Sequence, residues 1–191
     1  MEIRNKLNII KIKILFSLLI IFFITGCNNI NPMASEVTRN YSSFEEMCSE
    51  KNNLQSVRDW ALNYITYTTA EHQYMSYMGI DETEQRVNFL FDQKKGSCGD
   101  FASLFVMVAR RQNKECGFIF ESYDSFAHLR GWIKNDDGTI TETSNKNVYF
   151  SKYKNKEAMF DYYKSKTNGY FCFYKDNHQT IIKEINRGVV K

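Results

Sequence analysis

A cysteine at the start of a predicted helix is the residue in this sequence best placed to act as a nucleophile. Cys98 lies between Ser97 and Gly99, immediately before a long apolar run. A thiol at a helix N-terminus faces unpaired backbone N–H groups and the positive end of the helix dipole, and both stabilise the reactive thiolate. The backbone N–H of Cys98 can also donate to an oxyanion, with Tyr74 or Gln73 as candidates for a second, side-chain donor. This placement predicts attack by Cys98 on a carbonyl carbon.

A cysteine nucleophile needs a base, which is usually histidine, and the chain has three histidines. His178 lies in the polar turn KDNHQT, and His72 follows a predicted helix without periodic support. His128 lies in the predicted strand FAHLRGWIK, downstream of the cysteine helix. A cysteine and a histidine far apart in sequence but close in the fold are the usual arrangement of such sites. We therefore predict that His128 exchanges the proton with Cys98.

A third group that orients the histidine is expected on the next strand, where Glu142 and Asn145 are the candidates. With a two-residue turn at Asp137–Gly138, Glu142 lies on the face opposite to His128 and Asn145 lies on the same face. A four-residue loop places Asn145 directly opposite His128. A β-bulge would shift the parity of the pairing and bring Glu142 to the same face as His128. Either side chain can accept from the imidazole N–H and hold its tautomer. The residues leave the choice open.

Periodic patterns around these residues predict helices first and strands afterwards. The run that follows Cys98 is apolar around most of its circumference, which predicts a central, buried helix. Later segments alternate between apolar and polar residues, and NDDG predicts a hairpin turn. We therefore expect an α+β domain in which the cysteine-bearing helix packs on an antiparallel sheet, with Trp60 and Trp132 in the core. The expected helices are one opening at Ser43 and those over 54–65, 82–91, 98–111 and 156–164, and the expected strands are 116–122, 126–134, 139–145, 147–153 and 170–175.

Two segments resemble motifs of the transglutaminase-like superfamily. KKGSCGDFASLFVMVARRQNKECG is similar to its cysteine motif, and FAHLRGWIKNDDGTITETSN is similar to its histidine–acid hairpin. The resemblance covers about residues 82–145 and implies a papain-like arrangement with a Cys–His–Asp or Asn triad. The family includes amide-cleaving and amide-exchanging enzymes as well as members that have lost catalysis. It usually places Asp in the returning strand, and the ending ETSN resembles its acid-plus-Thr pattern at Glu142.

The first 26 residues have the features of an export signal. Residues 1–13 are cationic, and residues 14–24 are almost wholly apolar, a run too short to span a membrane with an ordinary helix. The following ITGC resembles the bacterial lipobox, which implies that Cys27 is lipidated and becomes the new N-terminus. We expect residues 1–26 to be a signal peptide, 27–42 a flexible tether and 43–191 the domain, anchored by lipid on the extracytoplasmic face of the membrane. An uncleaved N-terminal anchor is the alternative.

Charge and cysteine content exclude several partners. The net charge of +3 is carried by the signal segment, which contains four basic residues and one acidic residue: Arg4, Lys6, Lys11, Lys13 and Glu2. The remainder is neutral, so we expect no nucleic-acid partner. The other cysteines match no zinc spacing and no EF-hand loop is visible, so we expect no metal ion or cofactor. Disulfides are permitted outside the cell but are not required by the count.

These observations predict a surface-anchored cysteine enzyme. Cys98 attacks an amide carbonyl and forms a thioester, His128 moves the proton, and Glu142 or Asn145 orients the imidazole. Water or an amine then resolves the acyl-enzyme, so the class is a peptidase, amidase or acyltransferase acting on extracellular peptides, proteins or cell-wall peptides. The alternative is a catalytically inactive binding or scaffold module with the same fold.

Overall fold

The computed structural model describes residues 39–50, 53–68, 80–123, 126–166, 168–175 and 180–186. They fall within one compact unit, Thr38–Lys191. The predicted signal peptide, Cys27, His72 and His178 lie outside the described residues. The expected export, lipidation and anchoring therefore remain predictions.

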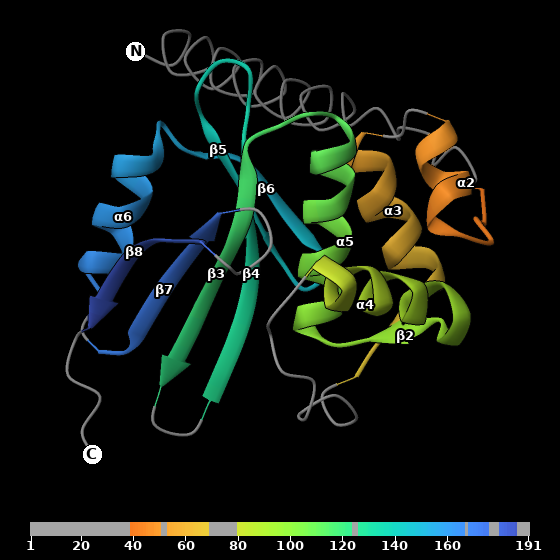
Figure 1. Ribbon diagram of the computed structural model, residues 1–191, viewed down its shortest axis with the longest axis horizontal. Coiled ribbons are helices and arrows are strands. Elements are labelled where there is room, and N and C mark those ends of the chain that lie inside the picture. The colour runs from red at the N-terminus through yellow and green to blue at the C-terminus, as the bar shows by residue number, and fades with distance from the viewer. Residues whose placement is uncertain are drawn as a thin grey trace, which may run out of the picture. The chain divides into compact units, whose positions relative to one another are not determined.

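Within the described residues, four helices precede the main sheet, and local capping sets the starts of the first two. The Ser43 side chain accepts from the backbone N–H of Glu46 at 3.1 Å, and Asn53 accepts from that of Ser56 at 2.9 Å. Such caps satisfy N–H groups that have no partner within the helix. Figure 1 shows these helices together on one side of the sheet. They are α2 (Phe44–Ser49), α3 (Leu54–Tyr64), α4 (Ile80–Gln93) and α5 (Cys98–Arg111).

The described strands that follow form one antiparallel sheet in the order β6-β5-β4-β3-β7-β8. The strands expected at 116–122, 126–134, 139–145, 147–153 and 170–175 are confirmed, with shifts of at most one residue at the ends. Their bounds are β3 Cys116–Tyr123, β4 Phe126–Lys134, β5 Ile140–Ser144, β6 Asn147–Tyr153 and β7 Tyr170–Lys175. The edge strand β8 (Thr180–Asn186) was not predicted, because most of its side chains are exposed and give little alternation. The α+β class is confirmed.

The sheet separates two hydrophobic clusters, one on each face. Neighbouring residues of a strand alternate between them: Phe118 and Ile133 pack on the α5 side, whereas Trp132 packs on the other. On that second side α6 (Lys156–Lys164) covers the sheet. The side chain of its residue Tyr163 is buried in the cluster between the helix and the sheet. The alternation is the period of a strand that is buried on both faces.

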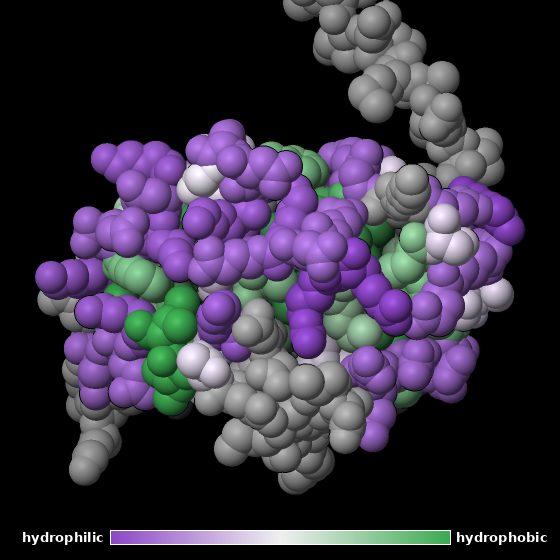
Figure 2. Space-filling model, turned by 45° about the horizontal axis from the view of Figure 1, so that its top comes forward, coloured by the Kyte–Doolittle hydropathy of each residue, from purple (hydrophilic) through white to green (hydrophobic). Residues whose placement is uncertain are grey.

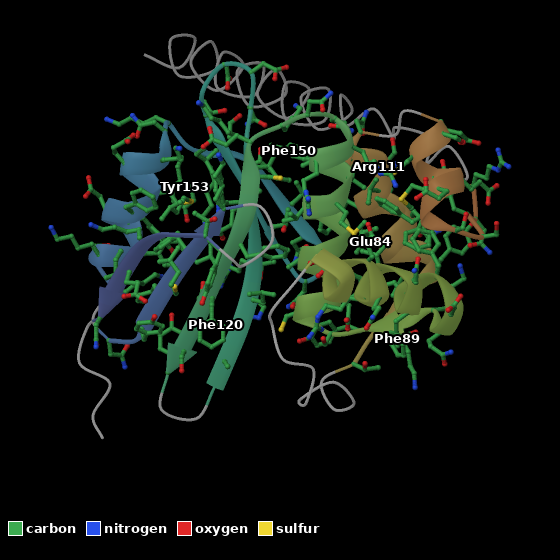
Figure 3. All side chains as sticks on the ribbon, in the orientation of Figure 1. Glu84, Phe89, Arg111, Phe120, Phe150 and Tyr153 are labelled. Carbon is green, nitrogen blue, oxygen red and sulfur yellow. The ribbon has the colours of Figure 1, made fainter. Side chains whose placement is uncertain are left out.

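The helix α5 is the centre of the larger cluster, as predicted from its apolar run. Every residue from Gly99 to Ala109 is buried, and side chains fill the space between α5 and the sheet in Figure 3. A Cβ on Gly131 would lie 2.6 Å from Thr143 Oγ1 and 3.1 Å from Val106. Glycine at this position of β4 therefore lets the helix approach the sheet closely.

A small parallel ladder, absent from the prediction, joins the chain after α3 to the loop before α5. It consists of β1 (Thr66–Tyr67) and β2 (Lys95–Gly96). The backbone N–H of Thr66 donates to the Lys94 carbonyl at 2.8 Å, and that of Thr68 donates to the Gly96 carbonyl at 2.9 Å. These two bonds fix Tyr67 beside the loop that leads into Cys98.

Within the described residues, no helix is both long and apolar enough to cross a bilayer. Figure 2 shows one face of the protein, which is mostly hydrophilic with hydrophobic side chains in small groups. Such a surface is typical of a domain whose large apolar residues are enclosed in a core.

Candidate active site

Cys98 is the first residue of α5, and a buried polar network holds the turn that precedes it. Asp100 is fully buried and accepts from the Ser97 backbone N–H at 2.7 Å and from the Ser97 hydroxyl at 2.8 Å. Arg86 from α4 neutralises the Asp100 carboxylate at 3.1 Å. A carboxylate in the first helical turn satisfies unpaired N–H groups, so the network fixes the backbone at the cysteine.

Close packing of the same turn also depends on glycine. A Cβ on Gly96 would overlap Leu90 Cδ2 of α4 and would lie 3.1 Å from Asp100 Cβ. Because Gly96 has no side chain, the turn can rest directly on α4. Helix α4 therefore positions Cys98 through both Leu90 and Arg86.

The Cys98 thiol is half-buried and lies against the backbone of β4. Burial raises the pKa of the Cys98 thiol, and hydrogen bonds from the backbone N–H groups of Leu129 and Gly99, which act to lower it, do not outweigh burial. The sequence led us to expect a thiolate stabilised by the helix start. In the structure desolvation is the larger effect, so the resting group is a thiol.

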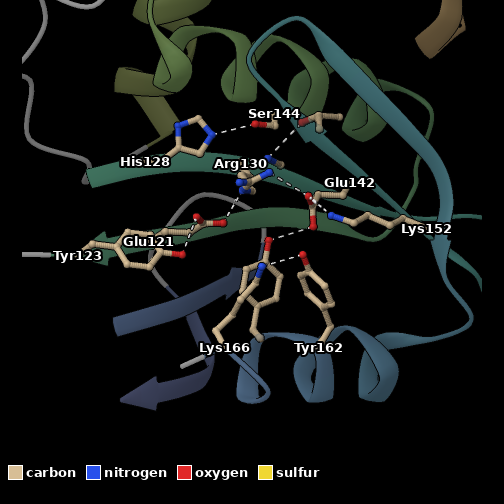
Figure 4. Close-up of polar contacts among 12 residues, drawn as sticks. Glu121, Tyr123, His128, Arg130, Glu142, Ser144, Lys152, Tyr162 and Lys166 are labelled. Atoms are coloured by element: carbon tan, nitrogen blue, oxygen red, sulfur yellow. Dashed lines mark hydrogen bonds and ion pairs between the residues drawn. The ribbon is translucent and has the colours of Figure 1, made fainter. Parts of the chain in front are cut away.

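Contact with Leu129 brings Cys98 to the residue that follows His128 in the chain. His128 is buried, with 6% of its surface exposed, and its ring extends from β4 towards Ser144 on the side away from β3 (Figure 4). The helix start and the histidine strand thus meet just beyond the end of β5. The sequence predicts that the thiol and its base pair at this seam, and the pairing of the two side chains remains a prediction.

The hairpin register decides which residue of β5 lies nearest to His128. Arg130 pairs with Ser144 and Trp132 pairs with Glu142, so the loop between the paired strand ends spans the five residues 135–139. The two-residue turn and the four-residue loop considered from the sequence are both wrong. An odd loop length changes the parity, so Glu142 lies on the same face as His128, without a bulge between β4 and β5.

The group that contacts the His128 ring is the Ser144 hydroxyl. Nε2 of His128 and Oγ of Ser144 are 2.9 Å apart. Ser144 was not among the predicted site residues, because its position depends on the register and because a hydroxyl is a weaker orienting group than a carboxylate. Ser144 is the last residue of β5. The sequence could have indicated it only if the length of the hairpin loop, and therefore the strand register, had been known.

Glu142 is committed to an ion cluster on the α6 side of the sheet rather than to His128 (Figure 4). Its carboxylate is fully buried and accepts from Lys152 at 2.6 Å and from Arg130 at 3.1 Å. The hydroxyls of Tyr153 and Tyr163 donate to it at 2.6 and 2.9 Å. Burial acts to raise the pKa of Glu142, but these hydrogen bonds and charges lower it overall, so the carboxylate stays ionised.

Arg130 connects this cluster to a second buried acid and to the histidine strand. Its guanidinium also pairs with Glu121 of β3, and charge interactions with both carboxylates raise the Arg130 pKa despite burial. Arg130 is two residues from His128 on the same face of β4. A permanent cation therefore lies close to the imidazole.

Asn145, the other predicted orienting residue, lies in the turn between β5 and β6. Its φ of 52° is left-handed, a conformation that asparagine tolerates better than most residues. Its Oδ1 is buried without a hydrogen-bond partner. The structure thus gives Asn145 a turn position next to Ser144, whereas the contact with the imidazole belongs to Ser144.

The environment of His128 favours the neutral imidazole. Burial and the Arg130 charge lower the pKa of His128 to about 4, against a smaller opposite effect of Glu142. Near neutral pH the ring is therefore an uncharged base. Together with the raised pKa of Cys98, this makes the resting pair a thiol and an imidazole instead of a thiolate and an imidazolium.

Among the described residues, Cys48, Cys98, Cys116 and Cys172 form no disulfide bond. In the same part of the chain, no group of three His, Cys, Asp or Glu side chains is arranged to hold a metal ion.

Comparison with known families agrees with this arrangement. A sequence profile of the Transglutaminase-like superfamily matches residues 37–154, a range that includes Cys98, His128 and Ser144. The chain therefore belongs to the transglutaminase-like superfamily, as the two motifs predicted, and its domain has a fold of cysteine-based enzymes. Comparisons with curated proteins and with solved structures found no significant match.

Proposed function

We propose that this protein is a cysteine enzyme that attacks amide carbonyls through Cys98. The observation that carries the proposal is the contact between the Cys98 thiol at the α5 start and the β4 backbone at Leu129, the residue that follows His128. The His128 ring in turn has its Nε2 within 2.9 Å of the Ser144 hydroxyl. A half-buried thiol and a buried neutral imidazole on adjoining elements are the groups needed for acyl transfer. Membership of the superfamily supports the same class.

The Ser144 hydroxyl holds the ring of His128 and is compatible with the tautomer that a base requires. When Nε2 carries the proton, it donates to the Ser144 hydroxyl, and Nδ1 then presents a lone pair for the thiol proton. As sulfur attacks, the proton moves to Nδ1 and the carbonyl electrons move to oxygen, where the Cys98 backbone N–H can stabilise them. Collapse of this intermediate breaks the C–N bond, and the imidazolium protonates the departing amine.

The thioester is resolved by a second nucleophile. Neutral His128 takes a proton from water or from a primary amine, the new C–O or C–N bond forms, and the Cys98 thiol is regenerated. Water gives hydrolysis, as in a peptidase or amidase, and an amine gives acyl transfer. These steps use only the groups of the site and assign no role to a metal or cofactor.

The setting we propose is the extracytoplasmic face of a bacterial membrane. Lipidation at Cys27 would tether the domain through its polar N-terminal segment. Amides within reach of such a domain are those of extracellular peptides, proteins and cell-wall peptides. This location rests on the signal and lipobox patterns of residues 1–27.

A second candidate is a binding module that has lost catalysis. It is favoured by the hydroxyl of Ser144 standing where a carboxylate would stabilise an imidazolium, and by the raised pKa of the thiol. Both features lower the reactivity expected of the resting site. A direct test of acylation separates the two functions.

The test uses an activated ester, p-nitrophenyl acetate, with the full chain in detergent. We expect an acetyl group on the peptide that contains Cys98, released by hydroxylamine and absent in Cys98→Ala. In His128→Ala we expect acylation to be slower by about a hundredfold, the size of a lost general base. Wild-type protein that gains no acetyl group at Cys98 would establish the binding module instead.

A further inference from the structure

Tyr67 is held beside the nucleophile by backbone pairing. In the β1–β2 ladder it is paired with Gly96, two residues before Cys98. The hydrogen bonds of Thr66 and Thr68 flank it on both sides, at 2.8 and 2.9 Å. The position of the Tyr67 backbone is therefore tied to the turn that carries the thiol.

The aromatic ring of Tyr67 is fixed on the other side by α5. It stacks on Phe101 with a centroid distance of 6.2 Å and an interplanar angle of 16°. Phe101 is fully buried and lies one helical turn after Cys98, so it is a rigid support on the same helix face. Tyr67 is thus bracketed between residues 96 and 101, on either side of the nucleophile.

The Tyr67 side chain is accessible and protonated. It is 39% exposed, so a substrate that reaches Cys98 can also reach this ring. Burial of part of the ring and the nearby Cys98 sulfur raise the pKa of Tyr67. The hydroxyl therefore remains a hydrogen-bond donor at neutral pH.

We propose that the Tyr67 hydroxyl is the side-chain donor to the oxyanion that forms when Cys98 attacks a carbonyl, opposite the backbone N–H of Cys98. This inference rests on the proposed function. As the S–C bond forms, the carbonyl electron pair moves to oxygen, and the phenol donates to that oxygen without transferring its proton. When the carbonyl re-forms, the hydrogen bond weakens again, so the donor acts mainly in the transition state.

Other residues considered for this role lie elsewhere. Tyr74 and Gln73, the candidates from sequence, are outside the described residues. Ser97 uses its hydroxyl on Asp100 at 2.8 Å. Tyr67 is the described residue that combines a hydroxyl donor, solvent access and a fixed position beside the cysteine.

Two reactions of the same thiol separate a donor from a packing residue. Acylation by p-nitrophenyl acetate passes through an oxyanion, whereas alkylation by iodoacetamide does not. Tyr67→Phe keeps the ring on Phe101 and removes only the hydroxyl. Tyr149→Phe removes an exposed hydroxyl on β6, where the side chain is 43% exposed, and is the matched control. Both rates are followed on the Cys98 peptide by mass spectrometry.

In Tyr67→Phe we expect acylation to fall by at least about tenfold, which is less than the roughly hundred- to thousandfold typical of a lost oxyanion donor because the ester is activated. The alkylation rate should stay within about twofold, and Tyr149→Phe should change neither rate. Unchanged acylation, or equal losses in both reactions, would overturn the role of Tyr67 while leaving the proposed function intact. Wild-type protein that alkylates but does not acylate would instead contradict the proposed function.

Discussion

Nε2 of His128 lies 2.9 Å from the hydroxyl of Ser144, and Ser144 pairs directly with Arg130 in the neighbouring strand. The imidazole is thus oriented by a neutral group and flanked by a cation, while the nearby carboxylate of Glu142 is bound to other partners. A site built in this way keeps its base uncharged at rest. The following predictions test that arrangement.

Replacing Ser144 by Asp places a carboxylate against the imidazole. In Ser144→Asp the pKa of His128 should rise from about 4 by roughly one to three units, because a close negative charge stabilises the imidazolium. NMR titration of the His128 ring measures this directly. The companion variant Ser144→Ala should acylate at least about tenfold more slowly, because the ring loses the hydrogen bond that orients it. A His128 pKa that stays the same in Ser144→Asp would show that the two side chains do not interact.

Removing the charge of Glu142 should affect stability rather than catalysis. Glu142→Gln leaves the partly exposed Arg130 and Lys152 with one charged partner fewer and replaces the buried ionised acceptor of two tyrosine hydroxyls. The free energy of unfolding in urea should therefore fall by about 2 kcal/mol. Glu157→Gln, at an exposed position in the first turn of α6, is the control and should change it by less than about 0.5 kcal/mol. Acylation of the folded Glu142→Gln protein should stay within about threefold of wild type. If Glu142→Gln abolished acylation without changing the free energy of unfolding, Glu142 would instead be the residue that orients His128.

Stability should decrease as the pH falls from about 6.5 to about 4. The pKa of His128 is about 4 in the folded protein and about 6.5 when exposed. In this window the unfolded chain binds a proton that the folded chain does not, so the folded state loses about 3 kcal/mol relative to neutral pH. Urea unfolding at both ends of the window, compared between wild type and His128→Gln, isolates this part. The same pH dependence in both proteins would argue against a buried neutral imidazole.

Alkylation of Cys98 by iodoacetamide should increase with pH and should depend on His128. Burial raises the pKa of both half-buried thiols, Cys98 and Cys48. The charged groups that act on Cys48 are Arg111 and Glu45 rather than a histidine, so Cys48 is an internal reference. At neutral pH Cys98 should react faster than Cys48, and in His128→Ala the two rates should become similar. A Cys98 rate that is already maximal at pH 5 would reveal a preformed thiolate–imidazolium pair and would contradict the neutral resting state.

The sequence by itself predicted most of the elements and led us to propose Cys98 and His128 as the reactive pair. The apolar periodicity of residues 98–111 predicted the buried helix, and the alternation of residues 126–134 predicted the histidine strand, because both patterns are local properties of the chain. Cys98 and His128 could be named because one begins the helix and the other interrupts an apolar strand. The order of helices before strands predicted the α+β class, and the family motifs, which span these same segments, predicted the superfamily.

Only the tertiary structure decided what surrounds that pair. Five residues in the hairpin loop, instead of two or four, set the parity that placed Ser144 against His128 and sent Glu142 into the ion cluster. The β1–β2 ladder brought Tyr67 to the cysteine turn from 31 positions away. Burial, which no local pattern reports, outweighed the helix start in setting the pKa of Cys98. Register, long-range pairing and desolvation all depend on contacts between distant segments, so the identity and charge state of the site could be read only from the folded chain.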